Sequence, residues 1–216
     1  MKFKENILET LCKDYNTNMN LIFATNEYEN KKFSDEISID FAKNFKSGHE
    51  KSEEAKIARK KYAAEVMTPA SIIKKMNLQL IKNFNNEEIV NKTVCESCCG
   101  ECPFISNKHD VTNGKEFDFN ERYGMLDIKM KSIKKLGNIT DEKLINLLDT
   151  LGGYEFQGDN LYIGRKNILE DFIDWYEYLM NKKISEELMI KSAEIISKNF
   201  EQLDGLTFEQ PKEKIK

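Results

Sequence analysis

The sequence has only three prolines and ten glycines among 216 residues, and it has no apolar run of the ~18–20 residues that a membrane-spanning helix needs. The scarcity of proline and glycine argues against extensive disorder, and the missing apolar run excludes a membrane-spanning protein. No apolar stretch follows the N-terminal lysines, so we expect no secretory signal. The formal net charge of −4 gives the whole chain no attraction to nucleic acid, so DNA contact requires a local patch.

The cysteines also lack the dispersed spacing that is typical of a disulfide framework. Four of the five cysteines lie within eight residues, at Cys95, Cys98, Cys99 and Cys102. Neighbouring cysteines form disulfides only with strain, so we expect reduced thiols and a cytoplasmic protein. A thiol cluster of this kind can also bind zinc or an iron–sulfur centre, but adjacent Cys98 and Cys99 do not easily face one metal. The pattern therefore favours cysteines as small, unligated residues, with a metal site as the alternative.

The length fits one domain preceded by an arm. Residues 1–60 are expected to form a helical or irregular N-terminal arm, and residues 53–66 favour a helix. Thr68 is a good N-cap and Pro69 a good first helical residue, so a helix is predicted to begin there. Residues 209–216 form a charged tail.

The chain from residue 61 to 208 alternates between helical and strand-like segments. Strands are predicted at 91–96, 153–158 and 202–208, and helices at 140–151, 159–179 and 186–200. Pro103 is expected early in a helix, and the cation-rich stretch of about 106–140 is expected to be an insertion. Gly152 and Gly153 are expected to stop the preceding helix, and the lysines from Lys129 to Lys135 to form a solvated face. This order predicts an α/β fold with a parallel sheet.

Acidic residues stand at the ends of all three predicted strands. Glu96 precedes a turn of small residues that contains Gly100, Glu155 closes the second strand, and Asp204 closes the third. Ligands bind at the carboxyl ends of parallel strands, a glycine turn lets backbone amides approach a nucleotide, and a carboxylate can accept both ribose hydroxyls. The pattern indicates a nucleoside-binding site.

Six segments in order resemble the amino-group adenine DNA methyltransferases of bacterial restriction-modification systems. They are AEVMTP at 64–69, CESCCGECPFIS at 95–106, DVTNG at 110–114, RYGMLD at 122–127, GYEFQGDNL at 153–161 and FEQLDGL at 200–206. The resemblance implies a partial Rossmann-like methyltransferase sheet of three strands, with a helical arm and a helical insertion. It also implies that S-adenosyl-L-methionine is the cofactor and DNA the partner.

The resemblance assigns cofactor contacts residue by residue. It places Thr68 and Pro69 near the methionine end, Glu155 on the ribose and Asp204 at the adenine. The remaining implied contacts are Glu96, Ser97, Cys98, Gly100, Phe104 and Phe156.

The sequence also departs from the family. Transfer to an adenine amine uses an Asn/Asp-Pro-Pro-Tyr/Phe motif that grips the flipped base, but the only prolines are Pro69, Pro103 and Pro211. We therefore interpret the chain as truncated before that motif; it has no catalytic residue to assign and is expected to be inactive alone. Two alternatives remain: a non-catalytic subunit that assembles with a second chain supplying the missing half, and a small cysteine–metal module.

Overall fold

The computed structural model describes residues 3–14, 17–18 and 36–209. Part of the predicted arm, 15–16 and 19–35, lies outside the described residues. The helices are α1 (Glu5–Cys12), α2 (Ile39–Ala42), α3 (Glu53–Ala63), α4 (Ala70–Ile81), α5 (Asn86–Asn91), α6 (Met125–Leu136), α7 (Asp141–Asp149), α8 (Gly158–Met180) and α9 (Glu186–Asn199). The strands are β1 (Lys13–Asp14), β2 (Thr17–Asn18), β3 (Val94–Glu96), β4 (Leu151–Tyr154) and β5 (Phe200–Glu201), and a 3₁₀ turn spans Gly48–Glu50.

A small parallel sheet confirms the α/β prediction. Its strand order is β3-β4-β5, with Val94 opposite Leu151 and Gly153 opposite Phe200. β4 is central, so the outer side of β3 is an edge of the sheet, and no described strand pairs with that side. The three strands end at one edge of the sheet, which brings residues 96, 155 and 202–208 to the same end of the molecule.

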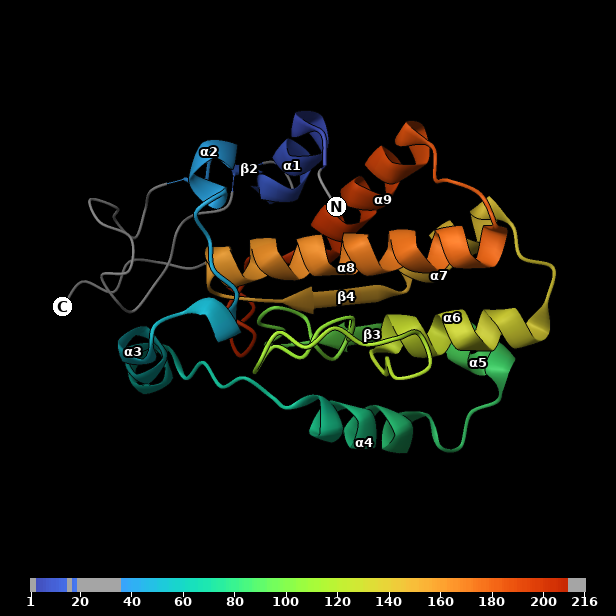
Figure 1. Cartoon of the computed structure of the whole chain (residues 1–216), viewed down its shortest axis with the longest axis horizontal. Helices are drawn as coiled ribbons and strands as arrows, with labels where there is room; N and C mark the ends of the chain where they lie inside the picture. Colours follow the sequence, from blue (N-terminus) through green and yellow to red (C-terminus); the bar gives the residue numbers. More distant parts are fainter. Residues whose placement is uncertain (1–2, 15–16, 19–35, 210–216) are drawn as a thin grey trace.

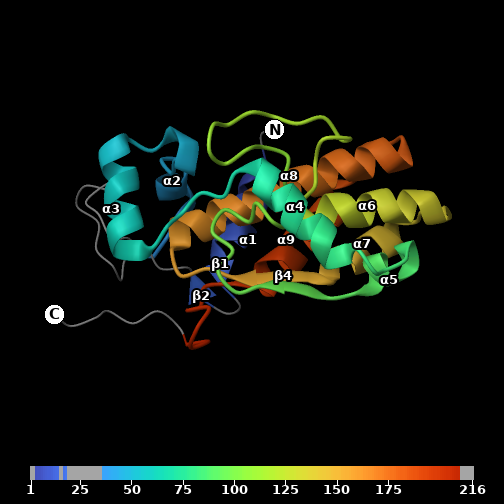
Figure 2. The same ribbon diagram turned by 90° about the horizontal axis from the view of Figure 1, so that it is seen from below.

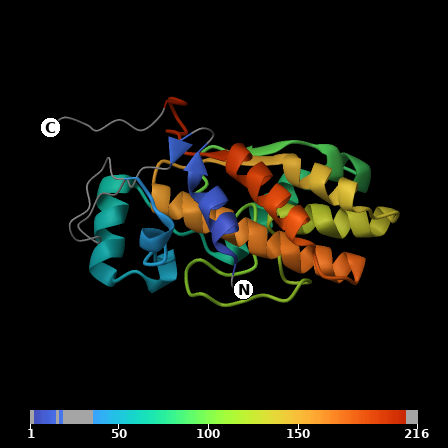
Figure 3. The ribbon, with the colours of Figure 1, turned by 90° about the horizontal axis from the view of Figure 1, so that it is seen from above.

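The long α8 organises the helical layers. It packs against α9 and α1 on one side and α6 on the other (Figure 1). Seen from above, α1 lies beside α9 over α8 (Figure 3), and Ile7 and Leu11 of α1 are buried in the common core. The predicted apolar face of α8 is confirmed, because Phe172, Trp175 and Tyr176 are all buried. Seen from below, α4 lies on the surface (Figure 2).

The first residue of a helix can be predicted where the sequence has a side chain that caps it. Thr140 accepts a hydrogen bond from the Lys143 amide at 3.2 Å, as predicted. The predicted start at Thr68 is wrong by one residue: Pro69 occupies the cap position in an extended conformation, and α4 begins at Ala70 without a side-chain cap. Pro69 has no side-chain acceptor, and its carbonyl accepts the first helical hydrogen bonds, from the amides of Ile72 and Ile73 at 2.9 and 3.2 Å.

Three other local predictions were wrong. No helix begins at Pro103, because residues 97–124 form turns before α6, which itself lies inside the predicted insertion. Gly152 and Gly153 lie within β4 and do not stop a helix. Residues 202–208 are turns, and the third strand is the short β5 just before them.

Close backbone contacts explain the glycines in β4. A Cβ atom on Gly152 would lie 2.9 Å from the Asn199 carbonyl oxygen, and one on Gly153 would lie 3.0 Å from the Glu96 carbonyl oxygen. These positions need a residue without a side chain because neighbouring backbone passes so close. Glycine therefore serves strand packing here.

Lys129 is fully buried, which corrects the prediction of a solvated lysine face at this residue. Its ammonium donates to the carbonyls of Val90 and Lys92 and to the Thr150 hydroxyl, at 3.0, 2.5 and 2.8 Å. Burial lowers the pKa of Lys129 to about 8. Lys129 thus ties α6 to the end of α5 and to the entry of β4.

A buried arginine on α8 joins the two ends of the described chain. Arg165 donates to the Leu11 carbonyl at 3.0 Å, to the Ser197 carbonyl at 3.0 Å and to the Phe200 carbonyl at 2.8 Å. These carbonyls belong to α1, α9 and β5. One guanidinium therefore satisfies acceptors from three elements that are far apart in sequence.

Candidate functional site

The turn after β3 is fastened to the end of β4. The Cys99 amide donates to the Tyr154 carbonyl at 2.8 Å, and the Cys102 amide donates to the Cys99 carbonyl at 2.7 Å. Gly100 has a φ of +54°, which the absence of a side chain permits, and Cys102 adopts the same left-handed region at +59°. The turn therefore presents its backbone toward the residues that follow β4.

Glu155 accepts hydrogen bonds from two backbone amides beside this turn. Its carboxylate accepts from the Gly100 amide and from the Gln157 amide, both at 2.8 Å. Burial raises the pKa of Glu155 to about 7, against the lowering effect of these two hydrogen bonds. Glu155 thus links the turn after β3 to the start of α8.

Glu96 is the last residue of β3, and it lies close enough to Glu155 for the charge of Glu155 to raise the pKa of Glu96. One of its carboxylate oxygens, Oε2, is buried and has no hydrogen-bond partner. Burial raises the pKa of Glu96 to about 8, and the charge of Glu155 adds to the shift. We call Glu96 and Glu155 the acidic pair; the sheet brings together these two sequence-predicted residues.

Asp204 lies near Cys98, as the acidic pair does. Burial raises the pKa of the Cys98 thiol, and the negative charges of Glu155, Asp204 and Glu96 raise it further. Asp204 Oδ1 accepts from the amides of Leu206 and Thr207, at 2.8 and 3.3 Å. The three acids predicted at strand ends therefore converge on one turn.

The other predicted residues lie around this turn or apart from it. The Phe104 carbonyl accepts from Asn77 Nδ2 of α4 at 2.9 Å, and the Phe156 carbonyl accepts from Gln202 Nε2 at 3.0 Å. Ser97 is exposed. Thr68 is half-buried and Pro69 exposed at the start of α4, and no hydrogen bond within the described residues joins either to the acidic pair.

A buried ionic network beside the acidic pair was missed at the sequence level. Glu65 accepts from Lys51 at 3.0 Å, from Arg59 at 2.9 Å and from Asn160 at 2.8 Å. Arg59 also pairs with Asp159 at 2.5 Å. We call these five residues the arm network, because they fasten residues 51–65 to the first turn of α8.

The arm network extends to the turn through Glu101. Glu101 Oε1 accepts from the Gly48 amide at 2.6 Å and lies 4.0 Å from Lys51 Nζ. Burial raises the pKa of Glu101 to about 7, although Lys51 lowers it. The sequence contains no local indication of this network beyond a run of polar residues. Its partners lie about 100 positions apart in the chain, so no short pattern could predict their contacts.

The cysteines are all unpaired thiols. Cys99 and Cys102 are buried, and the hydrogen bond from Cys99 to Cys102, followed by burial, raises the pKa of Cys99 well above its ordinary value. Gly164 of α8 makes room for Cys102, because a Cβ there would lie 2.6 Å from Cys102 Sγ. Among the residues that the structure describes, no three histidine, cysteine or acidic side chains are arranged to hold a metal ion.

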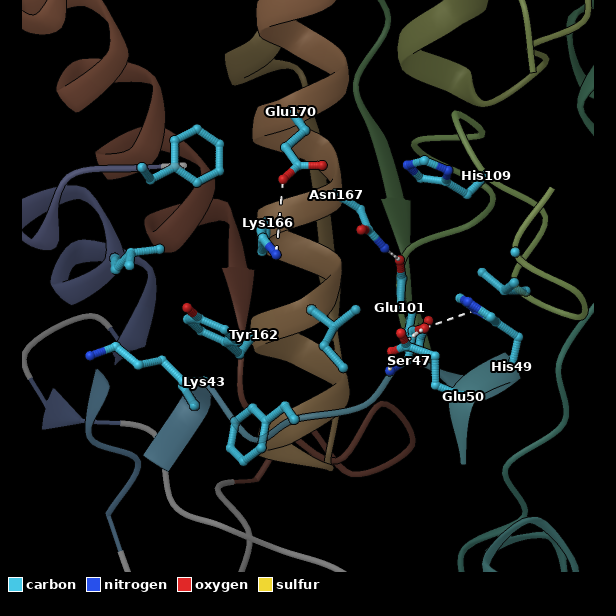
Figure 4. A pocket seen from close by; sticks show the side chains of 17 residues that line it. Lys43, Ser47, His49, Glu50, Glu101, His109, Tyr162, Lys166, Asn167 and Glu170 are labelled. Atoms are coloured by element: carbon cyan, nitrogen blue, oxygen red, sulfur yellow. Dashed lines mark hydrogen bonds and ion pairs between the residues drawn. The ribbon is translucent and has the colours of Figure 1, made fainter. Parts of the chain in front are cut away.

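A separate pocket of about 790 Å³ lies along α8 (Figure 4). Glu101 lines it, but Glu96, Glu155 and Asp204 do not. Both histidines of the chain line it too, and Ser47 Oγ lies 2.8 Å from His49 Nδ1. Among residues 97–104, Glu101 is therefore the one that borders this pocket.

No family model, no curated protein and no solved structure matches the chain. Within the described residues, no helix combines the length and the apolar character needed to cross a bilayer.

Proposed function

We propose that this chain is the S-adenosylmethionine-binding part of an enzyme that methylates the exocyclic amine of adenine in DNA. The observation that carries the proposal is the meeting of Glu96 and Glu155 across a glycine-containing turn at the carboxyl ends of parallel strands. The ordered resemblance of six sequence segments supports the same function.

The residues present fit such a cofactor. Glu96 Oε2 is a buried acceptor without a partner, and a Cβ atom on Gly100 would meet nothing within 4 Å, so there is open space beside the turn. Glu155 uses one lone pair on each oxygen for the two backbone amides and keeps others for ribose hydroxyls. Asp204 uses Oδ1 for its own loop, which leaves Oδ2 for an adenine amine.

When bound, S-adenosylmethionine supplies a methyl group made electrophilic by its sulfonium. The contribution of this chain is to hold and orient the nucleoside and the amino-acid end of the cofactor. In this assignment the acidic pair and the turn from Ser97 to Phe104 hold the cofactor, and Thr68 and Pro69 lie toward its methionine end.

The target base needs groups that this sequence does not contain. An Asn/Asp-Pro-Pro motif is missing, because none of the three prolines is adjacent to another. The proposal therefore places this motif outside these 216 residues, which by themselves transfer no methyl group.

One observation favours the related role of a non-catalytic assembly subunit. β3 has no described strand on its outer side, and α4 exposes an apolar stripe of Ile72, Met76 and Leu80, with exposed fractions of 40%, 55% and 57%. An open strand edge and an exposed apolar stripe are features that protein partners cover. α4 also carries Lys74 and Lys75 and no acid, so a partner with acidic flanks suits this face.

Calorimetric titration with S-adenosylmethionine tests the proposal. We expect saturable binding by the wild-type chain and, for Glu155→Ala, an affinity reduced by at least about tenfold, because a charged hydrogen-bond partner is lost. Glu194→Ala, an exposed residue of α9, is the matched control and should bind like the wild type. Absence of binding by the folded wild-type chain contradicts the proposal.

A methyl-transfer assay on DNA tests the second part. Tritiated S-adenosylmethionine and adenine-containing duplex DNA are incubated with the purified chain. We expect no incorporation of label above background, and transfer by the chain alone would contradict the need for a partner.

A further inference from the structure

Glu96 and Glu155 form a half-buried pair of carboxyl groups without a cation. Neither makes an ion pair within the described residues, and Oε2 of Glu96 has no hydrogen-bond donor. A buried anion without a counter-charge is costly, so such a group takes up a proton instead. The raised pKa values of both groups, about 8 and about 7, agree with this geometry.

The surrounding elements add negative charge. Glu65 of the arm network and Asp159 of α8 both raise the pKa of Glu155, and Asp204 acts on the same turn through Cys98. The neighbouring thiols also have raised pKa values and supply no compensating positive charge. They are those of Cys98, Cys99 and Cys102.

The nearby cations are already engaged. Lys51 contacts Glu65 and Asn160, and Arg59 contacts Glu65 and Asp159. Both side chains are buried, with exposed fractions of 1%, so neither can swing across to the acidic pair without breaking the arm network. Positive charge at the acidic pair must therefore come from a ligand.

We propose, on the premise that this site binds S-adenosylmethionine, that Glu96 of the acidic pair holds one proton in the free protein and releases it when a cationic ligand binds. The O–H bond of one carboxyl group breaks, its electron pair stays on the oxygen, and the proton passes to the buffer. The ligand's positive charge takes the place of the proton.

This exchange gives the site a charge preference. S-adenosylmethionine carries a sulfonium and an ammonium group, whereas S-adenosylhomocysteine has a neutral thioether in place of the sulfonium. A carboxylate close to the sulfonium favours the cationic form by about tenfold or more at the effective dielectric of a protein surface. The site is therefore selective for the methyl donor over the demethylated product.

Titration calorimetry of the full chain at pH 7 measures both effects. Phosphate and Tris buffers differ in ionisation enthalpy, so the difference between the two observed heats counts the protons released. We expect release of roughly one proton per S-adenosylmethionine, less for S-adenosylhomocysteine, and about tenfold tighter binding of the former.

Glu96→Gln separates this role from a structural one, because the amide has the same shape and Glu96 makes no described side-chain hydrogen bond. We expect proton release to fall to near zero and S-adenosylmethionine affinity to fall about tenfold, with S-adenosylhomocysteine affinity little changed. Glu194→Gln is the control, and circular dichroism confirms that both variants fold. Equal affinity for the two nucleosides without proton release overturns this inference and leaves the proposed function standing, whereas binding of neither nucleoside overturns both.

Discussion

Gly205 lies directly against the carbonyl oxygen of Ser97: a Cβ atom at position 205 would lie 1.5 Å from that oxygen. No real side chain tolerates such an approach, so this contact requires glycine. It holds the segment with Asp204 against the turn that follows β3, and the aromatic contact between Tyr154 and Phe208, with ring centroids 5.5 Å apart, supports it.

Gly205→Ala is therefore expected to push the segment after β5 away from the turn. Overpacking of this kind costs about 1–3 kcal/mol, and the backbone must move since the clash is with a carbonyl oxygen. Hydrogen exchange should show faster exchange at the Leu206 and Thr207 amides, which now bond to Asp204. Leu206→Ala changes a side chain that is 85% exposed and should leave exchange unchanged; unaltered exchange in Gly205→Ala contradicts the packing.

The arm network should contribute strongly to stability. Arg59→Met removes the cation that pairs with Asp159 and Glu65 in a buried place, which costs about 3–5 kcal/mol in free energy of unfolding. Lys56→Met, in the same helix, removes an exposed pair with Glu53 and should change stability by no more than about 0.5 kcal/mol. Urea denaturation of both variants measures the difference, and equal midpoints would show that the network is not a stabilising element.

Stability should fall as pH rises from about 5 to 8. The pKa is about 8 for Glu96 and about 7 for Glu155 and Glu101 in the folded chain, against an ordinary value of 4.5, so in this range the folded state binds more protons than the unfolded state. Their stabilising contribution is complete below pH 4.5 and is lost as pH rises through the folded pKa values. The lowered pKa of His109, caused mainly by burial, acts in the opposite direction.

Thermal unfolding measured at pH 5.5, 7 and 8 checks this dependence. A loss of several kcal/mol across the range is expected for the wild type, and Glu96→Gln should flatten the curve because its amide does not titrate. A stability that rises with pH in the wild type would contradict the burial of these carboxyl groups.

The two faces of α4 should respond in opposite ways to substitution. Ile73 is fully buried, so Ile73→Ala is expected to lower the free energy of unfolding by about 2–4 kcal/mol. Met76→Lys and Leu80→Lys change residues that are 55% and 57% exposed, and should alter stability by about 0.5 kcal/mol or less. Urea denaturation of the three variants gives the energies. A large stability loss in the lysine variants would mean that the stripe is packed in solution.

Local patterns predicted the parts of the fold that local forces decide. The Thr140 cap and the apolar face of α8 follow from side chains that act within one or two helical turns. The parallel order of β3, β4 and β5 follows from the alternation of helices and strands. The proximity of Glu96 and Glu155 follows in turn, because both come at the ends of neighbouring parallel strands.

Distant contacts decided the parts that could not be predicted. Gly152 resembles a helix stop in sequence, but the passing Asn199 carbonyl makes it a strand residue. In the sequence Lys129 resembles a surface lysine. In the fold it lies beside the carbonyls at the end of α5 and donates hydrogen bonds to them. The arm network joins residue 51 to residue 160, and no local pattern carries information over that distance.

Arg165 has a consequence for how the chain loses its structure. Its guanidinium bonds to carbonyls of α1, α9 and β5, so detaching either end of the described chain leaves buried donors unsatisfied in the middle of α8. The first helix and the last strand therefore separate from the body together, in one cooperative event that couples the beginning of the polypeptide to the loop that carries Asp204.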